Sequence, residues 1–257
     1  MRLPTKEKWL WLVLLTIVII LWQFIAVYVV KKPVILPSFT AVIFSFYELR
    51  KYILPDILVS LLHFAIGMVL AFAVAIPLAI AMGWFDTAFK AVDPIIELIR
   101  PIPPLAWVPL AIAWFHLTHY AAGFIIFIGA FFPILIASYT GFRDVPKVLV
   151  ETGKVLGCIG NRKLIRYVAI PYALPSIATG TRVGMGVAWM CVVAAEMFSV
   201  SKYGLGFRIF ARFFPMHQMD YVVAYMLILG LLALCIDRLF RHFVEGKLFK
   251  WKKGIVK

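Results

Sequence analysis

Six long apolar segments restrict the fold of this chain more than any other feature. They cover approximately residues 9–30, 57–83, 94–115, 120–141, 173–199 and 219–240. A helix needs about 20 apolar residues to cross a hydrocarbon core about 30 Å thick. Backbone polar groups in a bilayer must be satisfied within the chain, which favours helices. The sequence therefore predicts an all-α integral membrane protein with six transmembrane helices.

Composition supports this class and excludes others. Hydrophobic residues make up 64% of the chain and charged residues 15%, whereas a soluble domain carries about 25% charged residues. The net charge of +14 lies beside the spans, as in cytoplasmic connections of membrane proteins, so no nucleic-acid partner is expected. The three cysteines lack metal-ligand spacing. We therefore expect neither a metal nor a cofactor in this chain.

The distribution of basic residues predicts the orientation. If both termini are cytoplasmic, the inner connections hold 17 Lys and Arg residues and the outer connections hold seven. This bias is the one that membrane insertion favours. The first apolar run is longer than the core of a signal peptide, which spans about 7–15 residues, so we expect it to be the first span.

The connection after the first span carries a second helical pattern. Ser38 is suited to an N-cap, and Val42, Phe46, Leu49 and Ile53 recur at helical spacing, together with Ile43. The sequence predicts an amphipathic helix that lies along the outer membrane surface.

The third span is interrupted between Arg100 and Pro104. Pro101, Pro103 and Pro104 lack backbone N–H groups and cannot lie in a regular helix. Irregular backbone at membrane depth must be covered by protein or line a cavity. Two interpretations stay open: an interior break within the span, or a boundary loop nearer the cytoplasm.

Span five combines small and ionisable residues. Gly180 and Gly184 form a pattern that lets two helices approach closely, within the chain or across a dimer axis. Arg182, Trp189 and Glu196 share one face, which we expect to be interior. Glu196 should meet a donor on another helix, and Arg182 should be left for the translocation pathway or for pairing with Glu97. We expect His63 of span two to be a satisfied packing residue.

A hydrophilic loop at residues 143–171 separates spans four and five. It carries six basic and two acidic residues and contains glycines at positions 153, 157 and 160. Such glycines permit sharp turns and close backbone contact. The loop predicts a docking surface for a soluble partner, the alternative being a solvated basic connection.

This loop resembles the EAA loop of ATP-binding-cassette (ABC) importer permeases. The resemblance rests on Glu151, Gly153 and Gly157, followed by a basic run that ends at Pro171. Two departures exist: Thr152 and Gly153 replace two alanines, and the distance from Gly157 to Pro171 is one residue longer. Further motifs in the same order resemble the branch that moves taurine, alkanesulfonates, nitrate, bicarbonate or thiamine-precursor pyrimidines: LPS at 36–38, RPIPPL at 100–105, GAFFPI at 129–134, PYALP at 171–175, TGTR at 179–182 and VAAE at 193–196.

The resemblance implies a non-enzymatic permease in a prokaryotic plasma membrane. It would act as a homodimer among membrane lipids, with two cytoplasmic ATPases and an external substrate-binding protein. No phosphate-binding loop motif occurs in the sequence, so ATP and Mg²⁺ would be bound by the partner ATPase. The coupling residues would be Glu151, Thr152, Gly153, Leu156, Gly157, Arg162 and Arg166. The translocation pathway would include Arg100, Pro103, Pro104, Arg182, Trp189 and Glu196.

The expected organisation has four parts. Residues 1–35 form a tail and the first span, 36–56 an external amphipathic segment, 57–245 the permease core with its coupling loop at 143–171, and 246–257 a basic cytoplasmic tail. The alternatives are a secondary transporter, which typically shows internal repeats, and a membrane-embedded enzyme, which needs clustered acids or histidines. Neither signature occurs in this sequence.

Overall fold

The computed structural model describes residues 5–198 and 202–244, which are helical and contain no strand. The expected tail at 246–257 lies outside these residues. The α-helices are α1 (Thr5–Phe24), α2 (Phe39–Trp84), α3 (Asp86–Ile99), α4 (Val108–Phe115), α5 (His119–Arg143), α6 (Lys147–Val155), α7 (Asn161–Leu164), α8 (Ile170–Glu196), α9 (Leu205–Phe207) and α10 (Met219–Phe243). Wider π-helical turns occur at Ile25–Val30, Ile165–Ala169 and Arg208–Phe213, and a 3₁₀ turn at Pro104–Trp107.

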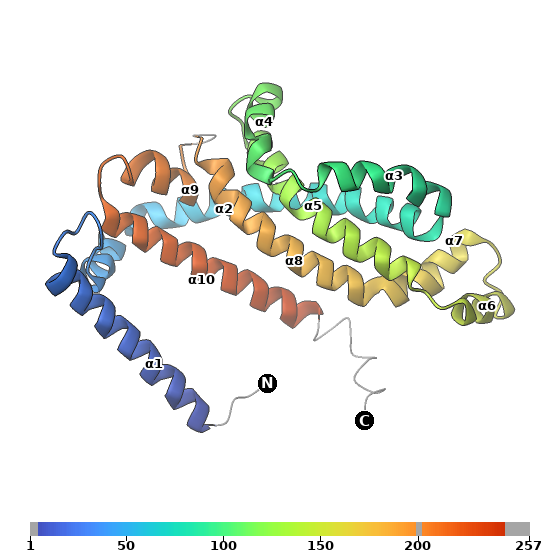
Figure 1. Cartoon of the computed structure of the whole chain (residues 1–257), viewed down its shortest axis with the longest axis horizontal. Coiled ribbons are helices and arrows are strands. Elements are labelled where there is room, and N and C mark those ends of the chain that lie inside the picture. Colours follow the sequence, from blue (N-terminus) through green and yellow to red (C-terminus); the bar gives the residue numbers. More distant parts are fainter. Residues whose placement is uncertain (1–4, 199–201, 245–257) are drawn as a thin grey trace.

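The predicted membrane class is confirmed. Five helical segments in the described part of the chain are long and apolar enough to cross a bilayer, and a bent pair, α3 with the segment ending at α4, makes a sixth. The two halves of this pair meet at 89°. The expected break at Arg100–Pro104 is therefore present, and α4 projects from one side of the bundle, where it packs against the start of α5 (Figure 1). The break changes the direction of the chain instead of bending a single continuous helix.

Helix α5 is the centre of the bundle, between α2 and α8 (Figure 1). Small residues bring these helices together. On α2, Ala71, Ala75 and Ala79 recur every four residues and are fully buried. Gly67 approaches α5 so closely that an added Cβ would lie 2.4 Å from Ile126 Cγ2. In a bilayer, where helix association depends on packing rather than on hydrophobic burial, such contacts stabilise the bundle.

The glycine pair of span five faces α5 in the same chain. A Cβ at Gly180 would lie 2.5 Å from Ala137 Cβ, and one at Gly184 would lie 2.9 Å from Ile134 Cγ1. The predicted close helix contact is thus confirmed. It is an intrachain contact, because α5 occupies the space that a second copy would need.

The expected surface helix at 36–56 is not a separate element. It forms the first part of α2, which continues without interruption for 46 residues. The N-cap is confirmed, since the Ser38 hydroxyl accepts a hydrogen bond from the Ala41 N–H. The apolar face is covered by protein: Leu49 packs in a cluster with Phe213 and Tyr225. Val42 and Leu49 of the predicted face are therefore buried against protein, whereas Ile43 is 51% exposed. The location of this segment at the outer membrane surface stays a prediction.

The α5–α8 contact yields a first prediction. Replacement of Gly180 by Leu should lower the midpoint of thermal unfolding in detergent, since overpacking a tight contact costs about 1–3 kcal/mol. Gly186→Leu on the same helix is the matched control, because nothing lies within 4 Å of a Cβ at Gly186. Equal unfolding midpoints for the two variants would contradict this packing.

Candidate functional site

The coupling loop contains a short helix that is anchored by one glycine. Helix α6 begins after Pro146, and its buried residue Gly153 faces the start of the next helix. A Cβ at Gly153 would lie 2.9 Å from Val168 Cγ2 and 3.2 Å from Leu164 Cδ2. The departure from alanine at this position therefore lets α6 lie directly against the segment that leads into α8.

Gly157 ends α6 for a conformational reason. Its φ is +89°, where only glycine is unstrained, and no atom lies within 4 Å of a Cβ built there. The Cys158 N–H bonds to the Gly153 carbonyl and the Gly157 N–H to the Lys154 carbonyl. These two bonds make a Schellman C-terminal motif. Gly157 is thus needed for the conformation of the turn, and no described residue fills the space that a side chain would occupy there.

The extra residue between Gly157 and Pro171 has two places where the chain can absorb it. Gly160 adopts φ +88° immediately before α7, as expected for a turn near that position. The π-helical turn Ile165–Ala169 follows, in which the Ile170 N–H bonds to the Ile165 carbonyl. A π turn holds one residue more than an α turn between bonded groups. The helix from Asn161 to Glu196 therefore continues through the insertion.

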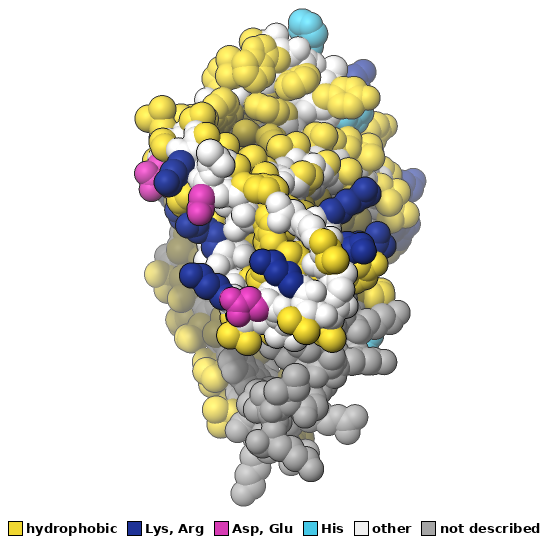
Figure 2. Space-filling model, turned by 90° about the vertical axis from the view of Figure 1, so that its right-hand side faces the viewer, with side chains coloured by type: hydrophobic (Ala, Val, Ile, Leu, Met, Phe, Trp, Pro, Cys, Tyr) yellow, Lys and Arg dark blue, Asp and Glu magenta, His cyan; other side chains and the backbone are white. Residues whose placement is uncertain are grey.

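The tip of the loop is apolar and exposed. The exposed fractions are 86% for Val155, 77% for Leu156 and 80% for Ile159. Figure 2 shows this end of the molecule, where Lys and Arg side chains are interspersed with hydrophobic ones. Besides Leu156, five of the predicted coupling residues are also exposed: Glu151, Thr152, Gly157, Arg162 and Arg166. Val155 and Ile159 did not stand out in the sequence, because their exposure depends on how the turn is folded.

A groove lies where the broken third span meets α5 and α8. Its volume is ≈ 400 Å³, and it is lined by Arg100, Ile102 and Pro104 from the break and by residues such as Phe132, Val183 and Val187. A second cavity of ≈ 420 Å³ also touches Arg100 and is lined by Asp93, Glu97 and Tyr139. Pro103 precedes Pro104 in an extended conformation. Arg100 thus stands between an apolar and an acidic cavity.

The expected face of span five does not border this groove. Arg182 donates to Asp237 of α10 (Nε to Oδ1, 2.7 Å), so the expected pairing with Glu97 is wrong. Trp189 donates from Nε1 to the Leu229 carbonyl of α10 (3.1 Å). The residues of α8 that line the groove lie on a different side of the helix; they are Thr179, Gly180, Val183 and Val187. The structure therefore separates Arg182, Trp189 and Glu196 from the Arg100 break.

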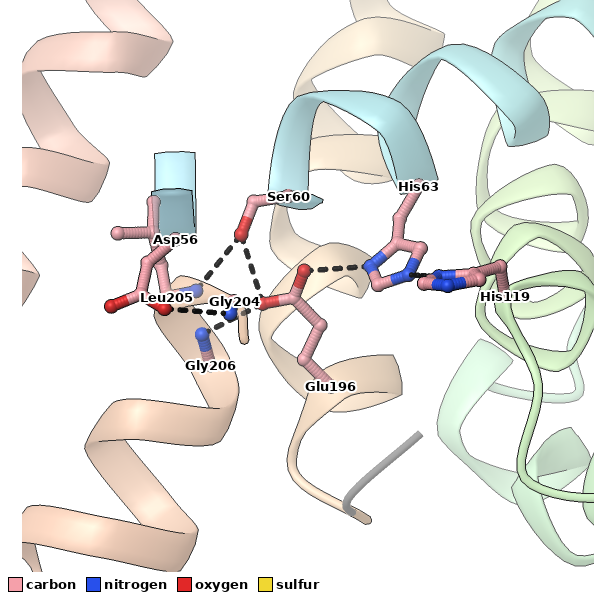
Figure 3. Close-up of polar contacts among 8 residues, drawn as sticks. All are labelled: Asp56, Ser60, His63, His119, Glu196, Gly204, Leu205 and Gly206. Atoms are coloured by element: carbon pink, nitrogen blue, oxygen red, sulfur yellow. Dashed lines mark hydrogen bonds and ion pairs between the residues drawn. The ribbon is translucent and has the colours of Figure 1, made fainter. Parts of the chain in front are cut away.

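Glu196 is the centre of a buried polar network (Figure 3). It is 1% exposed, and its Oε1 lies 2.8 Å from Nδ1 of the fully buried His63. Its Oε2 accepts from the Ser60 hydroxyl (3.0 Å) and the Gly206 N–H (2.8 Å). The expected donors on another helix are thus present. With Glu196 Oε1 as the acceptor, His63 donates from Nδ1, and its Nε2 can then accept from Nδ1 of His119, 2.7 Å away.

A second carboxylate extends the Glu196 network. Asp56 is fully buried and accepts from the Gly204 N–H, the Arg208 guanidinium and the Tyr225 hydroxyl. Ser60 also accepts from the Leu205 N–H (2.9 Å). The start of α9 is therefore held by side chains of α2. A Cβ at Gly204, where φ is +131°, would collide with the Glu196 carboxylate at 2.7 Å.

A pattern in the sequence indicates part of this network. Asp56, Ser60 and His63 are spaced four and three residues apart, so they share one face of a helix. A polar stripe on an apolar helix indicates buried partners. His63 is satisfied, as expected, but its partner Glu196 lies 133 positions away. No local pattern links two residues so far apart.

Known proteins match this chain along most of its length. Residues 71–247 match the family described as binding-protein-dependent transport system inner membrane component. A putative ABC transporter permease protein of Methanocaldococcus jannaschii is 46% identical over 98% of this chain and 95% of the relative. A putative aliphatic sulfonates transport permease protein of Bacillus subtilis is 30% identical, covering 98% and 91%. A nitrate import permease protein of Synechocystis is 35% identical, covering 74% and 68%.

These matches agree with the fold and with the motifs of the sequence. The matched region contains α5, the coupling loop, α8 and α10. The relatives are named as transport permeases, and the helices are those of a multi-pass membrane protein. The chain therefore belongs to the family of inner-membrane components of binding-protein-dependent transport systems, within the branch of ABC permeases that includes sulfonate and nitrate permeases.

Proposed function

We propose that this chain is the membrane-spanning subunit of an ATP-driven importer for a small anion. It pairs with a second copy of itself in the lipid bilayer, two cytoplasmic ATPases bind its coupling loops, and an external binding protein delivers the solute. ATP and Mg²⁺ are bound by the ATPases. Both termini lie in the cytoplasm. The named relatives support the anion, since aliphatic sulfonate and nitrate are both negatively charged.

One observation carries the coupling role: an apolar tip is exposed on a hydrogen-bonded turn. Leu156 and Ile159 are about four-fifths exposed. They lie at a charged end of the molecule (Figure 2), where the described residues leave most of each side chain uncovered. Clustered exposed apolar residues on a polar surface mark a contact with another protein. The basic residues around them complement an acidic rim on such a partner.

The contact between α6 and the segment that leads into α8 supports the transmission of motion. Gly153 holds α6 against Leu164 and Val168, which belong to the helical segment that continues into α8. This segment runs from Asn161 to Glu196. Because packed helices move as rigid bodies, a force on the tip of the loop moves α8 as well. ATP binding to the partner would thereby favour one arrangement of the bundle over another.

Changes at the loop tip should uncouple the importer. Leu156→Asp removes an apolar contact worth about 1.5–3 kcal/mol, so co-purification of the co-expressed ATPase should fall about tenfold or more. Glu151→Lys, which reverses an exposed charge, should act in the same direction. Leu156→Met keeps the contact and serves as the control. Thermal unfolding should be unchanged in all three variants, and undiminished ATPase binding by Leu156→Asp would exclude this docking surface.

Loss of the Glu196 carboxylate should loosen the bundle. Glu196→Ala leaves Ser60, His63 and Gly206 without their acceptor, at about 1–3 kcal/mol for each unsatisfied group, so the unfolding midpoint should fall strongly. Glu196→Gln retains an acceptor and should be milder. If Glu196→Gln unfolds like wild type yet transports less, the network also serves transport. A stable Glu196→Ala variant would show that these bonds do not hold the bundle.

The native Cys158 tests the orientation. It lies in the coupling loop and is partly exposed, whereas Cys191 is buried. With Cys235 replaced by Ser, a membrane-impermeant maleimide should label Cys158 in inverted vesicles and leave right-side-out vesicles unlabelled. A Cys158→Ser variant controls for background. Labelling of Cys158 from outside would reverse the proposed topology.

A further inference from the structure

The groove beside the broken third span has the chemistry of a binding site for a particular kind of anion. Among the described residues that line it, Arg100 alone is charged, and most of the others are apolar, such as Ile102, Phe132 and Val187. Its volume of ≈ 400 Å³ falls within the range of small-molecule sites.

Arg100 is available to a ligand. Its side chain forms no ion pair with any residue that the structure describes. The arginines of the neighbouring helices differ in this respect, because Arg182 is paired with Asp237 and Arg208 with Asp56. A guanidinium presents a planar set of donors that matches a sulfonate or carboxylate better than a point charge would. In an apolar surrounding this interaction gains strength.

The apolar walls restrict the ligand further. A fully hydrated inorganic anion loses water in such a groove and gains few contacts in return. An anion with a short hydrocarbon body can place its charge at Arg100 and its body against Phe132, Val183 and Val187, so that burial of apolar surface contributes to binding. The groove therefore favours organic monoanions over nitrate or bicarbonate.

The acidic cavity on the other side of Arg100 limits how tightly the anion is held. Asp93 and Glu97 line this cavity together with Arg100. Their negative charges attract the guanidinium and repel an anion that moves past it. A transport pathway needs such weak, transient binding, because a tightly held solute would not leave.

We propose that Arg100 is the anion-recognising residue of a solute site in this chain, and that this site selects small organic anions with an apolar body, such as short alkanesulfonates. The proposal rests on the proposed function and assigns the substrate class to one groove. Arg100 and the α5–α8 walls act together: the guanidinium selects the charge, and Phe132, Val183 and Val187 select the body.

A cysteine at Val183 tests the site directly, because this residue is 54% exposed and lines the groove. The complex of the permease with its ATPase carries Val183→Cys, with Cys158 and Cys235 replaced by Ser. Rates of modification are measured with an anionic sulfonatoethyl and a cationic trimethylammonioethyl methanethiosulfonate. Arg100→Gln should lower the anionic-to-cationic rate ratio about threefold or more, and Glu97→Gln should raise it. The same complex without Val183→Cys gives the background.

Arg182→Gln is the matched control. Arg182 neighbours Val183 in sequence but faces α10, and Arg241 still pairs with Asp237 when Arg182 is removed. The rate ratio should therefore stay unchanged in Arg182→Gln. In the protection arm, 1-propanesulfonate should slow modification of Cys at 183 in the presence of Arg100, whereas equal concentrations of nitrate or bicarbonate should have little effect.

Several outcomes would overturn the site. They are equal protection by nitrate, an unchanged ratio in Arg100→Gln, or an equal change in Arg182→Gln. No labelling in any nucleotide state would show that the groove is a covered contact, for example with the second copy. ATP-driven uptake by the same complex in proteoliposomes is measured in parallel with the cognate binding protein. If the complex takes up solute but Arg100→Gln leaves the rate ratio unchanged, only the site is refuted. If the rate ratio responds to Arg100→Gln but no ATP-driven uptake occurs, the proposed function is refuted.

Discussion

The buried carboxylate of Glu196 is the interaction on which the arrangement of the helices depends. A charge or polar group at membrane depth must be satisfied inside the protein, because the bilayer supplies no water. Glu196 meets this requirement with His63 and Ser60 of α2 and the backbone of Gly206. The carboxylate on α8 and its donors on α2 and α9 come from three separate segments, and they can meet in only one packing of those segments. The network therefore selects one arrangement among the many that apolar packing alone would allow.

Helix α8 connects this network to the coupling loop. The helical segment from Asn161 to Glu196 has 36 residues, which at about 1.5 Å per residue span roughly 54 Å. Gly153 fixes α6 against one end, and Glu196 fixes the other end to α2 and α9. Between these ends, Gly180 and Gly184 hold α8 against α5. Two faces of α8 thus have different contacts. Arg182 and Trp189 bond to α10 on one face, and Val183 lines the groove on the other.

The sequence was sufficient for features that local chemistry determines. Apolar length predicted the spans, the three prolines predicted the break after Arg100, and Ser38 predicted an N-cap, because each signal lies within a few residues. Pairings between helices could not be read in this way. Arg182 meets Asp237, 55 positions away, only because α8 and α10 have a particular rotation. Asp56 meets the Gly204 N–H across 148 positions for the same kind of reason. The site residues that the sequence missed are partners of this type.

The segment at residues 36–56 shows why an amphipathic pattern in a membrane protein is ambiguous. The spacing of Val42 and Leu49 establishes that one face is apolar, but lipid and protein are equally apolar neighbours. In the structure this face is covered by Phe213 and Tyr225, and Tyr225 in turn donates to Asp56. The decisive signal was therefore polar: Ser45 and Asp56 lie on the same helix and need partners that lipid cannot provide. In a bilayer, buried polar residues identify the interior face of a helix better than apolar residues do.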